Sequence, residues 1–228
     1  MIIKLIVLSI LQISVLLAQS QKPVVDIEGN IYKTTKIGNQ VWMAENLRVT
    51  QYRDGTPIPH VSNNTEWFLL TTGAYCYYDN NINAMRTLGA LYNWHAVNGD
   101  TDGDGVKDKE IAPEGWHVPT AYEWQTLKSY LTKEHAMKSG IALKSTTGWH
   151  ISPMSWPGTD DYGFTALPGG VRTWDEGYIF LGLGSYIWTA TGRGDKFAMQ
   201  WMQKFSLEAL ETSMTLKNAG LTIRLVKD

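Results

Sequence analysis

The chain has 228 residues, with 20 basic and 22 acidic side chains and a formal net charge of −2. This mildly acidic balance, without a basic cluster, argues against a nucleic acid as the partner. The length suits one domain with a sizeable hydrophobic core.

The amino terminus has the pattern of an export signal. Lys4 precedes a short apolar run from Leu5 to Ala18, which is followed by Gln19 and Ser20. This predicts a secretory signal peptide over residues 1–20, with cleavage after Ser20. A transmembrane anchor is the weaker alternative, because the run is short for a bilayer and contains three polar residues. We therefore expect an exported protein in the periplasm, at the cell surface or secreted, with no lipid anchor and no membrane span in the mature chain.

The first part of the mature chain predicts a linker, a hairpin and a loop. The composition of residues 21–30 favours a short linker. β-branched residues stand on both sides of Gly38-Asn39, which predicts strands over residues 31–37 and 40–43 joined by a two-residue turn. Residues 50–66 are polar and contain two prolines, which predicts a loop.

Cys76 is the only cysteine, so no intramolecular disulfide can form. Tyrosines flank it on both sides and predict a short strand with the thiol on one face. We expect a buried, inert thiol, because a reactive one would need a neighbouring base.

Two helices are predicted in the middle of the chain. Apolar residues at 88, 91 and 94–95 indicate a short amphipathic helix over Leu88–Val97. A longer helix over residues 120–133 begins at Thr120, which has capping-box spacing with Glu123. Residues 98–110, between the two helices, predict an acidic loop. The longer helix is expected to bury Trp124, Leu127 and Leu131.

Glycine and proline interrupt the chain after Gly140 and leave short apolar pieces between them. The best strand candidates among these pieces are residues 187–191, 197–202 and 221–226. Few helices early in the chain, with many short strands and long loops, predict an α+β domain with a mostly antiparallel sheet. This single domain is expected to cover residues 31–228.

Five segments carry recognisable motifs. They are residues 32–47, 89–94, 113–120, 163–172 and 220–228, and they include Gly-Asn-Gln-Val-Trp-Met-Ala-Glu-Asn-Leu, Pro-Glu-Gly-Trp-His-Val-Pro-Thr and Gly-Phe-Thr-Ala-Leu-Pro-Gly-Gly. In this order they resemble the Fibrobacter succinogenes major paralogous domain family over nearly all of residues 24–228. The resemblance implies an exported envelope or secreted protein with a C-type-lectin-like fold, and it implies no known activity.

The chain departs from that family at two positions. Family members often carry a cysteine before the Pro-x-Gly-Trp motif and another near the carboxyl end, where this chain has Ala112 and Leu225. If those cysteines form a disulfide in relatives, this chain replaces it with packing or with a bound ion. The Glu-Pro-Asn and Gln-Pro-Asp motifs of sugar-binding C-type lectins are also absent, so any glycan would not use that calcium site.

Residues 115–124 are also similar to a segment of formylglycine-generating enzymes, which share the lectin-like fold. Those enzymes oxidise a sulfatase cysteine with their own cysteine pair, and the single Cys76 cannot supply a pair. An enzyme related to these or to hydroxylating lectin-fold proteins is therefore the weaker alternative.

The acidic loop has the spacing of a calcium-binding loop. Four aspartates occupy positions 1, 3, 5 and 9, and Gly105 at position 6 permits a tight turn. The candidate metal ligands are Asp100, Asp102, Asp104, the carbonyl of Val106, and Asp108. Ile111 replaces the bidentate glutamate of an EF-hand, so the spacing is closer to the aspartate-rich repeats of extracellular proteins. The alternatives are a solvated acidic loop without an ion, and Glu110 as a ligand in place of Asp108.

Three tryptophans in Gly/Pro-rich loops are candidate ligand-binding residues: Trp149, Trp156 and Trp174. An exposed indole offers an apolar plane and a polar tip, which suits a sugar face or a protein surface. The alternative for each is a lid on a loop-rich core, since Trp is highly buried on average.

We expect the remaining polar residues of the motifs to have structural roles and not catalytic ones. We expect Glu45 to form a buried ion pair with Arg172 or Arg224, and His117 to be a packed, hydrogen-bonded residue. No histidine pair has helical metal spacing, and no nucleophile or phosphate-loop motif is present. The sequence thus favours a non-catalytic binding or surface module for an unknown glycan or protein, with calcium as its one candidate cofactor.

Overall fold

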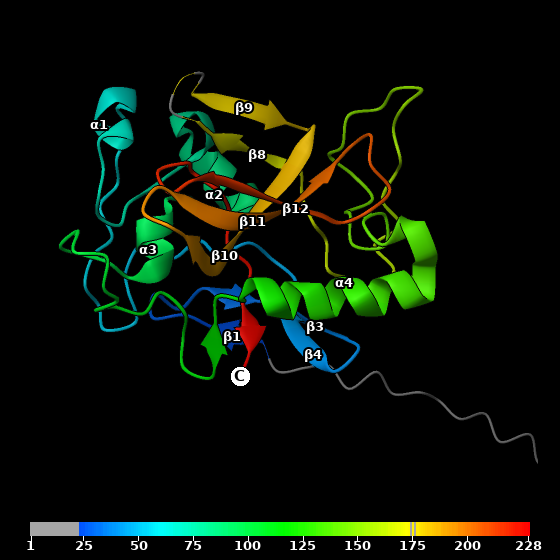
Figure 1. Ribbon diagram of the computed structural model, residues 1–228, viewed down its shortest axis with the longest axis horizontal. Helices are drawn as coiled ribbons and strands as arrows, with labels where there is room; N and C mark the ends of the chain where they lie inside the picture. The colour runs from blue at the N-terminus through cyan, green and yellow to red at the C-terminus, as the bar shows by residue number, and fades with distance from the viewer. Residues whose placement is uncertain (1–22, 174, 176) are drawn as a thin grey trace, which may run out of the picture.

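The computed structural model describes residues 23–173, 175 and 177–228, which form an α+β domain (Figure 1). Its α-helices are α1 (Asn64–Phe68), α2 (Ile82–Leu88), α3 (Trp94–Asn98) and α4 (Ala121–His135), and its 3-10 helices are η1 (Tyr78–Asn80) and η2 (Ala136–Lys138). All helices of the described part precede residue 139, and the three longest strands follow them, as the sequence predicts. The predicted signal peptide, residues 1–20, lies outside the described residues.

Two antiparallel sheets and three strand pairs make up the β structure of the described residues. The first sheet has the order β3 (Thr34–Ile37), β4 (Gln40–Met43), β13 (Val226–Lys227) and β7 (Trp116–His117). The second consists of β10 (Gly184–Arg193), β11 (Phe197–Lys204) and β12 (Glu211–Leu216). The pairs are β1 (Val24–Val25) with β2 (Ile31–Tyr32), β5 (Tyr75–Cys76) with β6 (Leu91–Tyr92), and β8 (Gly169–Arg172) with β9 (Tyr178–Leu181).

The predicted hairpin is confirmed, but its first strand is divided and the segment before it is no linker. β3 and β4 pair across Gly38-Asn39, and Gly38 takes a positive φ of +59°. Residues 31–32 form β2 and pair with β1, which lies inside the segment predicted as a linker. The buried Asp26 explains this, because its carboxylate accepts the Tyr32 hydroxyl at 2.6 Å and the Asn30 N–H at 2.9 Å. Part of residues 21–30 therefore belongs to the folded domain.

Helix α4 connects the two sheets (Figure 1). It begins with the predicted capping box, in which Thr120 Oγ1 accepts the Glu123 N–H at 3.3 Å and the Glu123 carboxylate accepts the Thr120 N–H at 2.8 Å. Trp124 is fully buried, with its ring centroid 4.6 Å from Trp42 of β4 and 5.7 Å from Trp201 of β11. The first turn of α4 is therefore fixed to both sheets through one side chain.

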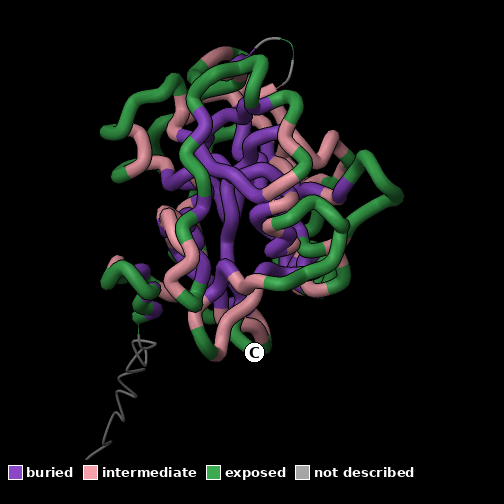
Figure 2. The backbone as a smooth tube through the Cα atoms, turned by 90° about the vertical axis from the view of Figure 1, so that its left-hand side faces the viewer, coloured by how far each residue is buried: buried purple, intermediate pink, exposed green. Residues whose placement is uncertain are grey.

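The segment 219–225 runs extended through the centre of the molecule, where Figure 2 shows the buried backbone. Its carbonyls accept main-chain hydrogen bonds from five residues elsewhere in the chain: Met43, Leu47, Tyr92, Arg172 and Trp188. Leu221, Ile223 and Leu225 enter one hydrophobic cluster, whereas Val226 enters another. The sequence predicted a strand over residues 221–226. Only β13 is a regular strand, because Gly220, Leu221 and Thr222 bridge to three different partners, Arg172, Tyr92 and Ile187.

The predicted helix over Leu88–Val97 is wrong. Helix α2 ends at Leu88, and Gly89, with φ of +81°, turns the chain away from it. Residues 91–92 form β6, where the Tyr92 N–H donates to the Leu221 carbonyl at 2.8 Å. Asn93 then caps α3 by accepting the Ala96 N–H at 3.0 Å. Strand pairing thus overrides a short helical periodicity.

The predicted loop over residues 50–66 also differs from the structure at its end. Helix α1 begins inside it, where the Asn63 side chain caps the helix.

The predicted buried Glu–Arg pair is also wrong, because both buried arginines bind neutral oxygens. Arg224 Nε donates to Asn46 Oδ1 at 2.6 Å, and its two other nitrogens donate to the carbonyls of Met43, Phe164 and Thr165. Arg172 donates to the carbonyls of Val61 and Ser62 and to Asn64 Oδ1. Glu45 instead accepts the Lys33 N–H at 2.7 Å.

Cys76 is fully buried in β5, as predicted. Burial raises the pKa of its thiol, although Arg172 and Tyr178 act in the opposite direction. Ala112 and Leu225, the positions of the family cysteines, are both fully buried in one hydrophobic cluster. Packing therefore occupies the place where the resemblance implies a disulfide in relatives.

We predict that Trp124→Ala destabilises the domain by about 3–5 kcal/mol, because it leaves a cavity between α4 and both sheets. Thr120→Ala should cost only about 1 kcal/mol, since it removes one helix cap. Urea denaturation of both variants and the unchanged protein measures the difference. Equal, small losses for both would show that α4 is not held through Trp124.

Candidate functional site

Two of the three predicted tryptophans line one cavity. Residues 146–152 and 155–158 surround a space of about 390 Å³, and both Trp149 and Trp156 contribute to its wall. The loops lie at the upper right of Figure 1, above the carboxyl-terminal part of α4. The Trp156 side chain is 41% exposed. Trp174, the third predicted residue, lies outside the described residues. We call this cavity the tryptophan cleft.

A buried lysine holds the loops of the tryptophan cleft. Lys144 Nζ donates to the carbonyls of Trp156 at 3.2 Å and Leu207 at 2.8 Å, and it lies 5.0 Å from the centre of the Trp149 ring. Burial lowers the pKa of Lys144 to about 8. Trp149 Nε1 donates to Ser145 Oγ at 3.1 Å, and the Trp156 N–H donates to the Phe205 carbonyl at 2.8 Å. The cleft is therefore formed by fixed loops.

The rim of the tryptophan cleft combines polar and apolar groups. Thr147, His150, Ser152 and Ser155 line it, and Ser155 Oγ donates to the His150 carbonyl at 2.8 Å. Ile151 is 90% exposed beside them. Hydroxyl and imidazole groups next to two indoles can bind a ligand that has both polar edges and apolar faces.

The acidic loop brings three of the predicted metal ligands together. One carboxylate oxygen each of Asp100, Asp102 and Asp104 lies within 4.8 Å of the others. Asp100 is buried, and its two oxygens accept the N–H groups of Gly103 at 2.7 Å and Gly105 at 3.1 Å. Asp102 and Asp104 are exposed, and each accepts a main-chain N–H two residues further on. Carboxylate oxygens at this spacing suit Ca²⁺, which binds six to eight oxygens in flexible geometry.

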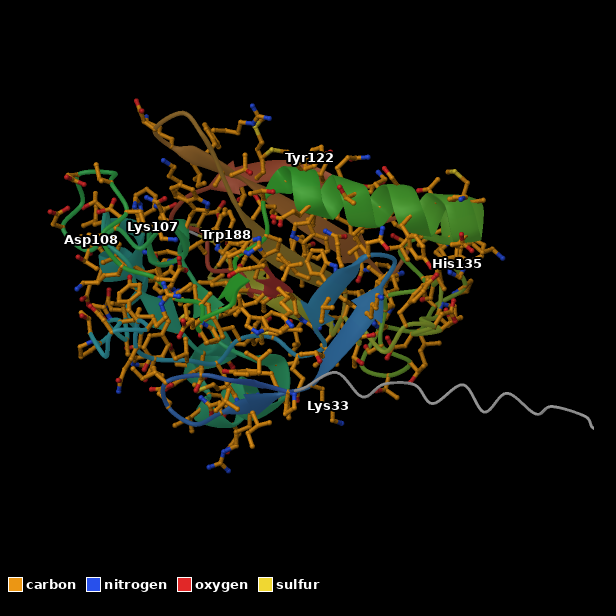
Figure 3. All side chains as sticks on the ribbon, turned by 90° about the horizontal axis from the view of Figure 1, so that it is seen from below. Lys33, Lys107, Asp108, Tyr122, His135 and Trp188 are labelled. Carbon is orange, nitrogen blue, oxygen red and sulfur yellow. The ribbon has the colours of Figure 1, made fainter. Side chains whose placement is uncertain are left out.

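Of the other proposed ligands, Asp108 and Glu110 do not belong to this carboxylate cluster, whereas the Val106 N–H donates to Asp104 at 2.7 Å. Asp108 accepts the Thr101 hydroxyl, and Val106 is 63% exposed. Glu110 pairs with Lys107 and accepts the Ala112 N–H at 3.2 Å. Figure 3 shows Lys107 and Asp108 together at one end of the molecule, away from His135 at the carboxyl end of α4.

His117 is hydrogen-bonded, as predicted, but it is half-exposed. Its Nδ1 lies 2.6 Å from Asp228 Oδ1, and its Nε2 lies 2.7 Å from Glu123 Oε1. Burial lowers the pKa of His117, but the hydrogen bonds to Asp228 and Glu123 outweigh that effect and raise it above the ordinary value of 6.5. The imidazole therefore joins the end of the chain to the start of α4.

The sequence did not predict a second cavity, of about 490 Å³, between the amino-terminal hairpin and the loop around Gly163. Its wall includes Lys33, Glu45, Arg48 and Arg86. The first three lie in or beside the first family-like motif, but nothing in the sequence places Arg86 of α2 next to them. We call it the basic cavity.

A comparison with known protein families gives one match. The family described as Fibrobacter succinogenes major domain matches residues 35–227. No curated protein and no solved structure matches the chain. None of the described helices is long and apolar enough to cross a membrane.

If the three clustered carboxylates hold one Ca²⁺, calcium should stabilise the folded state by mass action. We predict a higher melting temperature in several millimolar calcium than in EDTA, with about 2.7 kcal/mol gained at a hundredfold excess over the dissociation constant. Magnesium should have a smaller effect, because it demands strict octahedral geometry and loses water reluctantly.

The matched variants for this test are Asp102→Asn with Asp104→Asn, which should abolish the calcium response, and Asp195→Asn, which should keep it. Asp195 is an exposed aspartate in the turn between β10 and β11, far along the chain from the loop. Identical melting curves in EDTA and in calcium would show that the loop is a solvated acidic loop.

We predict that the stability contributed by His117 depends on pH. Because its pKa is raised on folding, the contribution is fully present below pH 6.5 and is lost as the pH rises through the folded-state pKa. The difference in unfolding free energy between the unchanged protein and His117→Gln should therefore shrink from pH 6 to pH 8. It should stay below about 1 kcal/mol, since solvent screens half-exposed pairs. His60→Gln, at an exposed histidine, is the control. A difference that is constant with pH would contradict the assignment.

Proposed function

The chain belongs to the Fibrobacter succinogenes major domain family, and we propose that it is a non-catalytic module that binds a glycan in the tryptophan cleft. The family description specifies no activity, so the proposal rests on the site. The observation that carries it is that Trp149 and Trp156 line one cavity of about 390 Å³.

The chemistry of the cleft suits a sugar. The C–H faces of a pyranose pack against an indole plane, while its hydroxyls need hydrogen-bond partners at the rim. Thr147, His150 and Ser152 line the cleft with such groups, whereas the Ser155 hydroxyl already donates to the His150 carbonyl. The Lys144 ammonium covers one face of Trp149, so Trp156, which is 41% exposed, provides the more accessible ring.

The fixed loops favour binding because little conformational entropy remains to be lost when a ligand enters. Lys144 ties the loop carrying Trp156 to the segment at Leu207, and the main-chain hydrogen bond from Trp156 to Phe205 repeats that connection. His150 is held in the same way, with its N–H donating to the Gly182 carbonyl at 2.8 Å and its ring 5.3 Å from that of Phe205.

The finer fold assignment, a C-type-lectin-like domain, is part of this proposal. It is supported by the family resemblance, by the pairing of β4 near the amino end with β13 at the carboxyl end, and by the long loops between β7 and β8. Export to the periplasm, the cell surface or the medium is also proposed, on the pattern of residues 1–20. Calcium in the acidic loop would be a structural ion near Thr71, at a distance in sequence from the cleft.

Two other functions have less support. An enzyme related to formylglycine-generating enzymes would use a cysteine pair, whereas this chain has the single buried Cys76. A protein partner on the same loops would use the exposed Ile151 and Met154, which flank the cleft, and would be recognised by apolar side chains instead of sugar hydroxyls.

We predict that Trp156→Ala lowers the affinity for a neutral oligosaccharide by about tenfold or more, because it removes the ring that a sugar face would cover. An oligosaccharide array identifies the strongest neutral probe, and calorimetry then measures its affinity for the two proteins. The fold should survive, since the main-chain groups of Trp156 make the contacts that hold the loop.

The control for this experiment is Tyr122→Ala. Tyr122 is 79% exposed on α4 and should contribute nothing to sugar binding (Figure 3). Failure of every neutral oligosaccharide to bind, or equal affinities of Trp156→Ala and the unchanged protein, would contradict the proposal. Binding of a protein that Ile151→Ser and Met154→Ser abolish would favour the protein-partner alternative.

A further inference from the structure

We infer that the basic cavity binds an acidic sugar, with the sugar carboxylate on its cationic wall and a hydroxyl on Glu45. The cavity measures about 490 Å³, which is in the range of small-molecule sites. It is lined by residues from three separate parts of the chain: the amino-terminal hairpin with the irregular segment 44–48 that follows it, α2 with Gly89, and the loop at 162–167. This site is separate from the tryptophan cleft and does not rest on the function proposed for it.

Three cations without counterions line this cavity. They are Lys33, Arg48 and Arg86, and none of them forms an ion pair with a carboxylate of the described residues. Lys33 and Arg86 are exposed, and Arg48 is half-buried. Like charges around one concave surface repel each other and raise the local concentration of anions, so a bound anion would be stabilised.

Arg48 is already held in a fixed position. Its Nη2 donates to the Ile31 carbonyl at 3.0 Å, and its Nε lies 3.4 Å from Asn30 Oδ1. The guanidinium lies 4.4 Å from the centre of the Tyr32 ring, which is fully buried. Nη1 has no hydrogen-bond partner among the described residues and remains for a ligand. A guanidinium held this way loses little entropy when it binds a carboxylate.

A fourth cation lies behind the cavity wall. Arg224 is fully buried and binds two wall residues, Asn46 through its side-chain oxygen at 2.6 Å and Thr165 through its carbonyl at 2.8 Å. Its immediate partners are neutral, so its charge is not cancelled by a bound carboxylate. Glu45, which lines the wall, and Asp160, which accepts the Thr165 N–H at 2.7 Å, are the carboxylates that interact electrostatically with Arg224.

Glu45 indicates which kind of anion the cavity binds: one that also carries a hydroxyl group. Its Oε2 accepts the Lys33 N–H at 2.7 Å, whereas its Oε1 has no partner among the described residues. That oxygen repels an anion but accepts a hydroxyl, so it favours a ligand with both groups. Ala44, Met85 and Leu167 add apolar surface to the same cavity, which suits the C–H face of a sugar ring. A uronic acid combines these three chemical features.

Calorimetric titration of the intact chain with glucuronate tests the inference, with glucose and inorganic phosphate as comparison probes. Glucuronate should bind saturably and more tightly than either comparison probe. The double variant Lys33→Gln, Arg86→Gln should bind it at least about tenfold more weakly, as expected when charge-assisted hydrogen bonds are lost. Both side chains are exposed, so an unchanged melting temperature shows that the variant is folded.

Lys36→Gln is the matched control, because Lys36 is an exposed lysine of β3 that does not line the cavity. It should bind glucuronate like the unchanged protein, and so should Trp156→Ala, whichever way the tryptophan cleft behaves. Equal binding of glucose and glucuronate, or no loss in the double variant, would overturn the inference. Phosphate binding as tight as glucuronate binding would overturn the assignment to a sugar.

Discussion

The fold depends on one buried extended segment near the carboxyl end. The carbonyls of residues 221–225 accept hydrogen bonds from the first sheet, from the β5–β6 pair and from β10. Alternate side chains enter different surroundings, with Leu221, Ile223 and Leu225 in one apolar cluster. These sheets share no strand with one another, so this segment provides main-chain contacts between several of them.

Buried cations supply hydrogen-bond donors to main-chain carbonyls in the interior of this fold. Long loops bring main-chain carbonyls into the interior, where an unpaired polar group is costly. Arg172, Arg224 and Lys144 are each fully buried and donate to two or more such carbonyls. A multivalent donor in one position therefore fixes several loop segments, which a hydrocarbon side chain cannot do. The desolvation of each charge is offset by these bonds and by aromatic rings beside them.

Both cavities adjoin these cations. The tryptophan cleft is held by Lys144, and the wall of the basic cavity is held by Arg224. The loops at these places are hydrogen-bonded to the core, although they contain little regular structure. A binding site can therefore be built on loops, because the rigidity comes from the buried charges beneath them and not from helices or strands.

The sequence alone determined the elements whose signals are local. The β3–β4 hairpin, the capped start of α4, the burial of Cys76 and the gathering of Asp100, Asp102 and Asp104 all follow from residues close together in the chain. Tertiary contacts decided the rest. Residues 91–92, within the predicted helix Leu88–Val97, form a strand because they pair with other strands. Arg172 and Arg224 bind carbonyl oxygens and no carboxylate of the described residues. The basic cavity forms where α2 lies next to the hairpin. Each of these outcomes depends on partners distant in sequence, which no local pattern encodes.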